Sequence, residues 1–281
     1  MTKSIKELDI FAANIRKAAL AAMNSFHGGH VGGAMSMCDL LAALYGGIMK
    51  IDPNNPKWPD RDWLSVSKGH CGPAVYAALA LSGYFPQEEL LTLNRNGTRL
   101  PSHCDRNRTP GIDVSTGSLG QGFSCTAGCA WAMKYKGMPN YMYTILGDGE
   151  CDEGQVWETA LFAATKQLDH LIAFVDCNEK QLDGYTRDIC DLGDLRKKFE
   201  DFGWYAQEID GHNIGSIFQA VGRAKNVSGK PSMIVLHTKK GKDCLFAERL
   251  SNNHFIGFAQ EDYEEAIGFL DRKIEQLGRG E

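Results

Sequence analysis

Two short, continuously apolar segments separated by a helical pattern constrain the fold of this chain most strongly. Residues 141–146 (YMYTIL) and 171–175 (LIAFV) lack strict alternation of apolar and polar positions, and residues 156–167 between them have helical periodicity. Strands that are apolar on both faces are typical of parallel sheets covered by helices on both sides. The sequence therefore predicts a strand–helix–strand unit within a parallel sheet.

The alternation of helical and strand-like segments continues on both sides of this unit. Downstream, the pattern predicts a helix near 193–202, a strand near 204–209, a helix near 213–225 and a strand at 232–237. Upstream, it predicts an amphipathic helix over 5–23 and a short strand at 63–66. Ser36, three residues before Asp39, predicts the cap of a helix over 40–48. Together these elements predict an α/β, three-layer fold with a mainly parallel sheet flanked by helices.

Composition excludes several classes of protein. A balance of 30 basic against 35 acidic residues removes the electrostatic argument for nucleic-acid binding. Nine cysteines, an odd number without a C-x-x-C pair, favour buried thiols in a reducing compartment over a disulfide scaffold. The charged N-terminus does not resemble a signal peptide, and no stretch approaches the ~20 apolar residues of a spanning helix. We therefore expect a cytoplasmic protein that binds neither nucleic acid nor membrane.

Oxygen-bearing side chains follow the two apolar segments, at the point where each predicted strand ends. Asp148, within Gly147-Asp148-Gly149, follows the first, and Asn178 follows the second. Because the carboxyl ends of parallel strands meet at one edge of a sheet, we expect both side chains in one crevice. Their oxygens suit Mg²⁺ or Ca²⁺ rather than zinc, with further ligands from phosphates, a backbone carbonyl and water. Gly147 and Gly149 are predicted to leave room for a diphosphate beside backbone N–H groups.

The spacing of this motif resembles the thiamine diphosphate fingerprint. Gly147-Asp148-Gly149 is followed after 28 residues by Asn178, with Cys177 where the family has the first of two asparagines. In that family the metal is held by the aspartate, the second asparagine and a backbone carbonyl two residues on. The resemblance therefore implies thiamine diphosphate and Mg²⁺ (with Ca²⁺ or Mn²⁺ as substitutes), the metal ligands being Asp148, Asn178 and the carbonyl of Lys180.

Further segments, in the family's order across about residues 15–240, resemble transketolases. They are Gly29-His30-Val31-Gly32, Ser67-Lys68-Gly69-His70, Leu100-Pro101-Ser102-His103, Gly117-Ser118-Leu119-Gly120-Gln121-Gly122 and Glu153-Gly154. The chain departs from the family's motifs at Val31, Ser102, Cys104 and Ser118. The resemblance implies the thiamine diphosphate-binding fold.

The resemblance also assigns roles to individual residues. His30 and His103 resemble substrate-side histidines, and His70 resembles a catalytic and cofactor-binding histidine near the diphosphate. Gly117 and Leu119 resemble backbone contacts to the aminopyrimidine side of the cofactor.

Two assignments in the later part of the chain follow from the same resemblance. Glu153 resembles a catalytic, cofactor-binding glutamate of the acid relay between active sites. His254 matches a late active-site histidine that binds the cofactor, although it stands in Asn253-His254-Phe255 rather than in the family's W-H-G pattern. The basic stretch 239–242 (KKGK) predicts a solvated loop, with attraction of an anionic substrate as the less favoured alternative.

Half of a complete transketolase is missing from this sequence. Thiamine chemistry needs a carboxylate against N1′ of the cofactor, which transketolases carry on a second, pyrimidine-binding domain. No second glycine-punctuated unit follows here, and the chain ends in an amphipathic helix over 263–277. The resemblance thus implies that 1–281 is a single diphosphate-binding domain. It would be the N-terminal subunit of a split transketolase, which pairs with a C-terminal subunit in an assembly that holds two copies of each. A fragment of a longer chain is the alternative.

The expected activity is transfer of a two-carbon ketol unit from a ketose phosphate, or a related anionic sugar, to an aldose. One alternative is another thiamine diphosphate enzyme, of the deoxyxylulose-phosphate synthase or 2-oxoacid dehydrogenase type, and a second is a non-catalytic regulatory half. The pairing of His30 with His103 favours the sugar enzymes. The departures at Val31, Ser102 and Cys104 indicate an unusual donor, for example a branched or sulfonated sugar, beside the default pentose phosphates.

Overall fold

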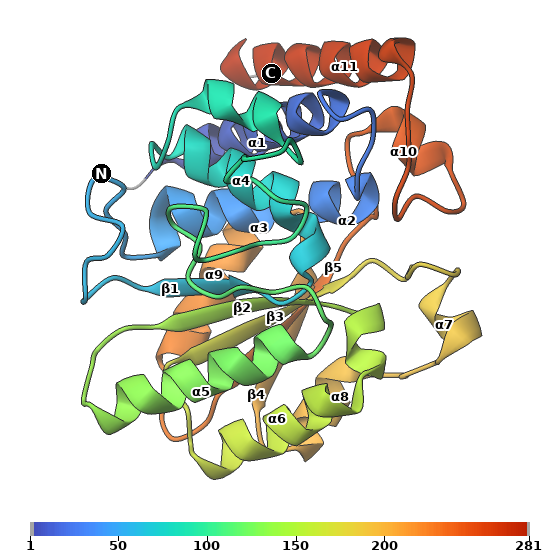
Figure 1. The fold of residues 1–281 in the computed structure, drawn as a ribbon. Coiled ribbons are helices and arrows are strands. Elements are labelled where there is room, and N and C mark those ends of the chain that lie inside the picture. Colours follow the sequence, from blue (N-terminus) through green and yellow to red (C-terminus); the bar gives the residue numbers. More distant parts are fainter. Residues whose placement is uncertain (1–2, 280–281) are drawn as a thin grey trace.

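A computed structural model describes residues 3–279 and arranges them in three layers around a five-stranded sheet (Figure 1). The strands are β1 (Trp63–Val66), β2 (Met142–Gly147), β3 (Leu171–Cys177), β4 (Tyr205–Asp210) and β5 (Ser232–His237). They lie in the order β1-β2-β3-β5-β4, and every neighbouring pair is parallel. The predicted α/β fold with a parallel sheet between helices is confirmed.

Helices cover both faces of the sheet. They are α1 (Ile5–Asn24), α2 (Val31–Ser36), α3 (Cys38–Ala43), α4 (Gly72–Leu81), α5 (Gln121–Tyr135), α6 (Gly154–Thr165), α7 (Thr186–Ile189), α8 (Leu195–Asp201), α9 (Ile214–Lys225), α10 (Leu245–Arg249) and α11 (Gln260–Arg279). One π-helical segment, η1 (Leu44–Ile48), and three 3-10 segments, η2 (Gly69–Cys71), η3 (Gln87–Thr92) and η4 (Gly149–Asp152), accompany them. Helices α5, α6 and α8 cover one face, and α1, α3, α4 and α9 lie on the other, with α11 outside α1 (Figure 1). Between residues 3 and 279, no helix has both the length and the apolar content needed to cross a bilayer.

Alternate residues of the central strand β3 supply two separate cores. Ile172 and Phe174 pack into the core formed with α1–α4 and α9, whereas Leu171, Ala173 and Val175 pack into the core formed with α5, α6 and α8. Successive side chains of a strand point to opposite faces, so a strand covered on both sides has apolar residues on both faces rather than on alternate positions only. This double coverage explains the continuous apolar run in the sequence.

The carboxyl ends of the strands meet at one edge of the sheet. Gly147 of β2 is paired with Asp176 of β3, and Cys177 of β3 is paired with His237 of β5. The backbone N–H of Asp148 donates to the carbonyl of Asp176 at 3.3 Å. The prediction that the side chains following β2 and β3 reach the same edge is therefore confirmed.

The prediction that Ser36 caps a helix over 40–48 is wrong. Ser36 is the last residue of α2, and α3 begins at Cys38 without a side-chain cap. The Ser36 hydroxyl instead donates to a carboxylate oxygen of Asp176 at 2.5 Å, and it lies 3.0 Å from the carbonyl of Gly33. A buried carboxylate 140 positions away in the chain competes for this hydroxyl, which local sequence spacing does not reveal.

Candidate cofactor and catalytic site

A cleft of about 170 Å³ opens at the carboxyl edge of the sheet. Eight of its lining residues are predicted site residues, namely His70, Leu119, Gly147, Asp148, Gly149, Asn178, Lys180 and His254. Six others are not, namely Gly33, Lys68, Glu150, Gln181, Leu182 and Lys240. The structure thus gathers residues from seven separated parts of the chain into one cavity.

The Asp148 carboxylate is the most strongly perturbed acid in the cleft. One oxygen accepts the N–H of Gly149 at 2.9 Å and the other accepts the N–H of Glu179 at 2.5 Å. Within residues 3–279 it makes no ion pair, although only 5% of the residue is exposed. Burial, together with the neighbouring Asp176, raises the pKa of Asp148 to about 7. A buried carboxylate without a basic partner matches a site for a bound cation.

The orientation of Asn178 follows from its neighbours. Its amide nitrogen donates to a carboxylate oxygen of Asp176 at 3.1 Å, and an ionised carboxylate can only accept. The amide oxygen therefore faces away from Asp176 and accepts the N–H of Lys180 at 3.2 Å. Asp148, Asn178 and the carbonyl of Lys180 together offer a carboxylate, an amide oxygen and a peptide oxygen. This set of hard ligands fits Mg²⁺.

The N–H groups of the two glycines beside Asp148 are bonded within the protein. The N–H of Gly147 donates to Glu150 at 3.1 Å, and the N–H of Gly149 is taken by the Asp148 carboxylate. Both glycines line the cleft, and the prediction that they leave room for a diphosphate beside backbone N–H groups stays a prediction. Neither glycine has a left-handed backbone. Gly149 is required for close packing, because a Cβ there would lie 2.7 Å from the Cβ of Gln181.

A buried ion pair between Lys68 and Asp176 supports the cation ligands. Lys68 is 2% exposed and Asp176 is 0% exposed, and the Lys68 ammonium also donates to the carbonyl of Gly33 at 3.1 Å. Burial alone would raise the pKa of Asp176, but Lys68 and hydroxyl donors, including Thr238, hold it below its usual value. Sequence reasoning missed both residues. Their signal was present, because Lys68 precedes His70 within a family motif and Asp176 ends the apolar run of β3.

Four predicted histidines form one cluster beside the cleft. The ring centroids of His30 and His70 lie 5.0 Å apart, those of His30 and His103 lie 5.8 Å apart, and those of His70 and His254 lie 4.7 Å apart. Burial is the main cause that lowers the pKa of each ring, to about 4 for His30 and about 3 for His254. At neutral pH the cluster is therefore uncharged, and each ring offers one donor and one acceptor.

Acidification should destabilise the folded chain through these histidines. The pKa of His30 falls from an ordinary 6.5 to about 4, so between these values the unfolded chain binds a proton that the folded chain does not. The free energy of unfolding should decrease as the pH falls through this window, and His30→Gln should show a shallower decrease. Urea denaturation across the window measures both slopes, with the exposed His237→Gln as control. Equal slopes for the His30 variant and the wild type would contradict this.

Lys240 enters the cleft from the loop after β5. It is 5% exposed, and its ammonium donates to the carbonyl of Lys180 at 2.8 Å and to Nδ1 of His254 at 3.2 Å. Burial lowers the pKa of Lys240 to about 8, although Asp148 acts in the opposite direction. The prediction of a solvated loop over 239–242 is therefore wrong for Lys240. The KKGK stretch itself contains no signal that distinguishes this lysine from its neighbours.

The remaining predicted residues lie at different distances from the cleft. A Cβ added to Gly117 would lie 3.6 Å from the ring of His103, which places Gly117 against the histidine cluster. Glu153 precedes α6 on the surface and packs beside Gly120, with no contact to the cleft. Glu158, one turn further along α6, is exposed as well.

Comparisons with known proteins place this chain among its relatives. The family model described as "Transketolase, thiamine diphosphate binding domain" matches residues 9–266. The 6-deoxy-6-sulfo-D-fructose transketolase subunit of Clostridium sp. (strain MSTE9) is 55% identical over 92% of this chain and 94% of its own length. An apulose-4-phosphate transketolase subunit from Phocaeicola vulgatus is 33% identical over 97% of both chains. Both relatives are named as subunits and are matched almost end to end.

A solved structure extends the comparison to a longer transketolase chain. The transketolase of Leishmania mexicana superposes with a TM-score of 0.86 and 27% identity, covering 100% of this chain but only 46% of that one. The present chain thus spans less than half of that transketolase. The matches favour transketolases over the other thiamine diphosphate enzymes considered as alternatives. This chain therefore belongs to the transketolase family and corresponds to its thiamine diphosphate-binding half, made as a separate N-terminal subunit in the split enzymes.

Proposed function

We propose that this chain is the N-terminal subunit of a transketolase that moves a two-carbon ketol unit from an anionic ketose to an aldose. One observation carries the proposal. Asp148, Asn178 and the histidine cluster share one edge of the sheet in a chain that subunits of split transketolases match almost end to end. In this reading, residues 1–281 form one diphosphate-binding domain, and the pyrimidine-binding domain resides on a partner chain.

The cleft residues fit a magnesium–diphosphate group. Asp148, Asn178 and the carbonyl of Lys180 would hold Mg²⁺, with Ca²⁺ or Mn²⁺ as substitutes. The Lys240 ammonium, which donates to this carbonyl in the structure, would give it up to the cation. Lys240 and His70 line the same cavity, so they would face the diphosphate. Thiamine diphosphate, when bound, supplies the electron sink for the two-carbon unit. This chain contributes the binding and orientation of that group.

The histidines would handle protons on the sugar. Because burial keeps His30 and His103 neutral at pH 7, each ring can accept a hydrogen bond from a sugar hydroxyl and donate one to a carbonyl oxygen. His103 is exposed and lies next to Gly117, which with Leu119 would border the aminopyrimidine side of the cofactor. These roles support proton transfer at the reacting carbonyl of the substrate.

For the donor we infer a ketose that carries a sulfonate. The relative with 55% identity is named for 6-deoxy-6-sulfo-D-fructose, whereas relatives named for apulose 4-phosphate are 33% and 38% identical. The departures Val31 and Ser102 flank the substrate-side histidines His30 and His103, and the Ser102 hydroxyl donates to Asn94 at 2.8 Å. A phosphorylated ketose is the second candidate, since most transketolases use one.

The two donors can be compared directly in the reconstituted enzyme. The chain, mixed with its C-terminal partner, should show a kcat/KM for 6-deoxy-6-sulfo-D-fructose at least about tenfold above that for fructose 6-phosphate. Equal or reversed values would overturn the donor and leave ketol transfer intact. No transfer from either sugar by an assembled, cofactor-loaded complex would overturn the function itself.

The isolated chain should be almost inactive. Because it corresponds to less than half of the solved Leishmania transketolase, we expect turnover below about 1% of that reached with the partner chain, a loss of at least ~2.7 kcal/mol in transition-state stabilisation. Titrating the partner into a fixed amount of this chain measures the gain. Substantial turnover without the partner would contradict the prediction.

Assembly as two copies of each subunit is supported by an exposed apolar surface on α5 and α6. Trp131, Tyr135 and Leu161 are 45%, 85% and 56% exposed, and the predicted relay residue Glu153 lies at the start of α6. Large apolar side chains gathered on one face mark an interaction site. Light scattering of the mixed chains should give the mass of a heterotetramer.

All nine cysteines are free, which supports a reducing, cytoplasmic setting.

A further inference from the structure

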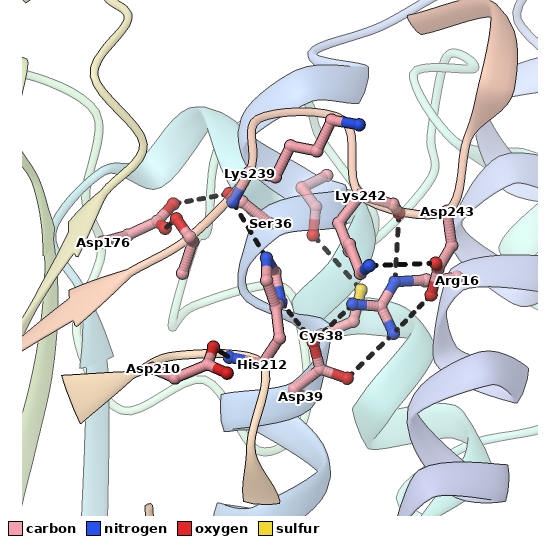
Figure 2. A network of polar contacts seen from close by, with 12 residues as sticks. Arg16, Ser36, Cys38, Asp39, Asp176, Asp210, His212, Lys239, Lys242 and Asp243 are labelled. Carbon is pink, nitrogen blue, oxygen red and sulfur yellow. Dashed lines mark hydrogen bonds and ion pairs between the residues drawn. The ribbon is translucent and has the colours of Figure 1, made fainter. Parts of the chain in front are cut away.

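A buried polar network lies outside the cleft, on the α1–α4 side of the sheet (Figure 2). Arg16 of α1 is 1% exposed and donates two hydrogen bonds to the carboxylate of Asp39 in α3, at 3.0 and 2.6 Å. Nδ1 of His212, in the loop between β4 and α9, lies 2.7 Å from the same carboxylate. The desolvation cost of a buried ion pair offsets much of its electrostatic gain, so such a pair contributes little net stability to a fold. The contacts that this network makes with other parts of the chain are therefore informative.

The geometry fixes the tautomer of His212. The backbone N–H of Lys239 points at Nε2 of His212 at 2.8 Å, and a backbone N–H can only donate. Nε2 is therefore the acceptor, and Nδ1 carries the proton that is donated to Asp39. His212 thus connects the carboxylate to the backbone of the loop after β5.

Arg16, at the other end of the network, binds the same loop three residues after Lys239. Nε of Arg16 donates to the carbonyl of Lys242 at 3.2 Å. Lys239 and Lys242 stand on either side of Lys240 and Gly241, and the N–H of Gly241 donates to the carbonyl of Gly32 at 2.9 Å. The loop is therefore clamped at both ends, with Lys240 between the two clamps.

Lys240 is the one side chain of this loop that enters the cleft. Lys239 and Lys242 point elsewhere, because their ammonium groups pair with Glu248 and Asp243. A lysine side chain has four rotatable bonds, so ordering it in a buried position costs conformational free energy. A loop backbone that is already fixed on both sides of Lys240 removes the further cost of ordering the loop at the moment of binding.

We propose that the network of Arg16, Asp39 and His212 is a positioning device that fixes the loop 239–242 and aims Lys240 at the diphosphate subsite. The proposal rests on the proposed function, because it takes the cleft to be a magnesium–diphosphate site. None of the three residues lines the cleft, so they act through Lys240 and are positioning residues.

Binding of inorganic pyrophosphate with Mg²⁺ tests the proposal without requiring turnover. Calorimetry on the full chain assembled with its partner should show binding weakened about tenfold in His212→Ala. His212→Gln keeps an acceptor at the position of Nε2 and should recover most of the affinity. The matched control is His237→Ala, because His237 ends the adjacent strand β5 with an exposed ring that touches neither the loop nor the cleft.

A double-mutant comparison separates positioning from a general structural role. If His212 acts through Lys240, then His212→Ala added to Lys240→Ala should cause no further loss of pyrophosphate binding. Additive losses would overturn the proposal, as would unchanged binding in His212→Ala. Amide exchange at Lys239 should also rise in His212→Ala and not in the His237 control. Failure of the wild-type complex to bind Mg²⁺–pyrophosphate would instead refute the proposed function.

Discussion

Replacing Asp148 with asparagine should lower ketol transfer by the two-chain enzyme at least about 100-fold. The substitution keeps the size of the side chain but removes the one negative charge among the three proposed cation ligands, which Mg²⁺ requires most. Calorimetry should show an equal or larger loss in Mg²⁺-dependent binding of thiamine diphosphate. Raising the Mg²⁺ concentration should restore part of the activity.

The stability of the chain should respond very differently to the same change. In the wild type, Asp148 is a buried carboxylate without a basic partner, so its removal relieves a desolvation cost that offsets the weakened hydrogen bonds to Gly149 and Glu179. The free energy of unfolding in the absence of metal should change by less than about 1 kcal/mol. Asp183→Asn, an exposed aspartate near Asn178, is the control and should alter neither property. Unchanged cofactor binding in Asp148→Asn would refute the cation site.

The second large effect concerns stability. Lys68→Met should lower the free energy of unfolding by about 3–5 kcal/mol, because it leaves the fully buried Asp176 carboxylate without its cation. Urea denaturation of the purified chain measures the change. Adding Asp176→Asn to Lys68→Met should recover most of the loss, since both charges are then gone.

A surface ion pair provides the control for the Lys68 variant. Lys134 pairs with Asp169 at 3.0 Å, and its side chain is 41% exposed. Lys134→Met removes the same type of residue and should cost less than about 1 kcal/mol. Similar losses in the two lysine variants would contradict the idea that burial of Asp176 makes Lys68 important.

The fold could be predicted from the sequence because its determinants are local. The apolar runs of β2 and β3 and the helix between them are short-range patterns, and parallel pairing then places Asp148 and Asn178 at one edge without further information. The four histidines are different. They come from four separate segments between residues 30 and 254, so only the family resemblance, and not their spacing, could group them.

The buried polar contacts could not be predicted, because their partners are far apart in the chain. Lys68 pairs with Asp176 across 108 positions, and the Lys240 ammonium meets the carbonyl of Lys180 across 60. A short hydrophilic stretch has the same sequence pattern whether the side chain of its basic residue is solvated or buried in a cleft. The prediction of a helix cap at Ser36 was wrong for the same reason. The hydroxyl that could cap a helix instead donates to the distant Asp176 carboxylate.

Because helices cover both faces of β3, the number of residues in this strand is as constrained as their types. Asp176 follows Ile172 and Phe174 at every second position, and therefore shares their side of the sheet. Inserting or deleting one residue within 171–177 would exchange the two sets of apolar side chains and turn Asp176 away from Lys68 in the same step. Engineering of this subunit can tolerate altered loop lengths far more readily than a single indel in its central strand.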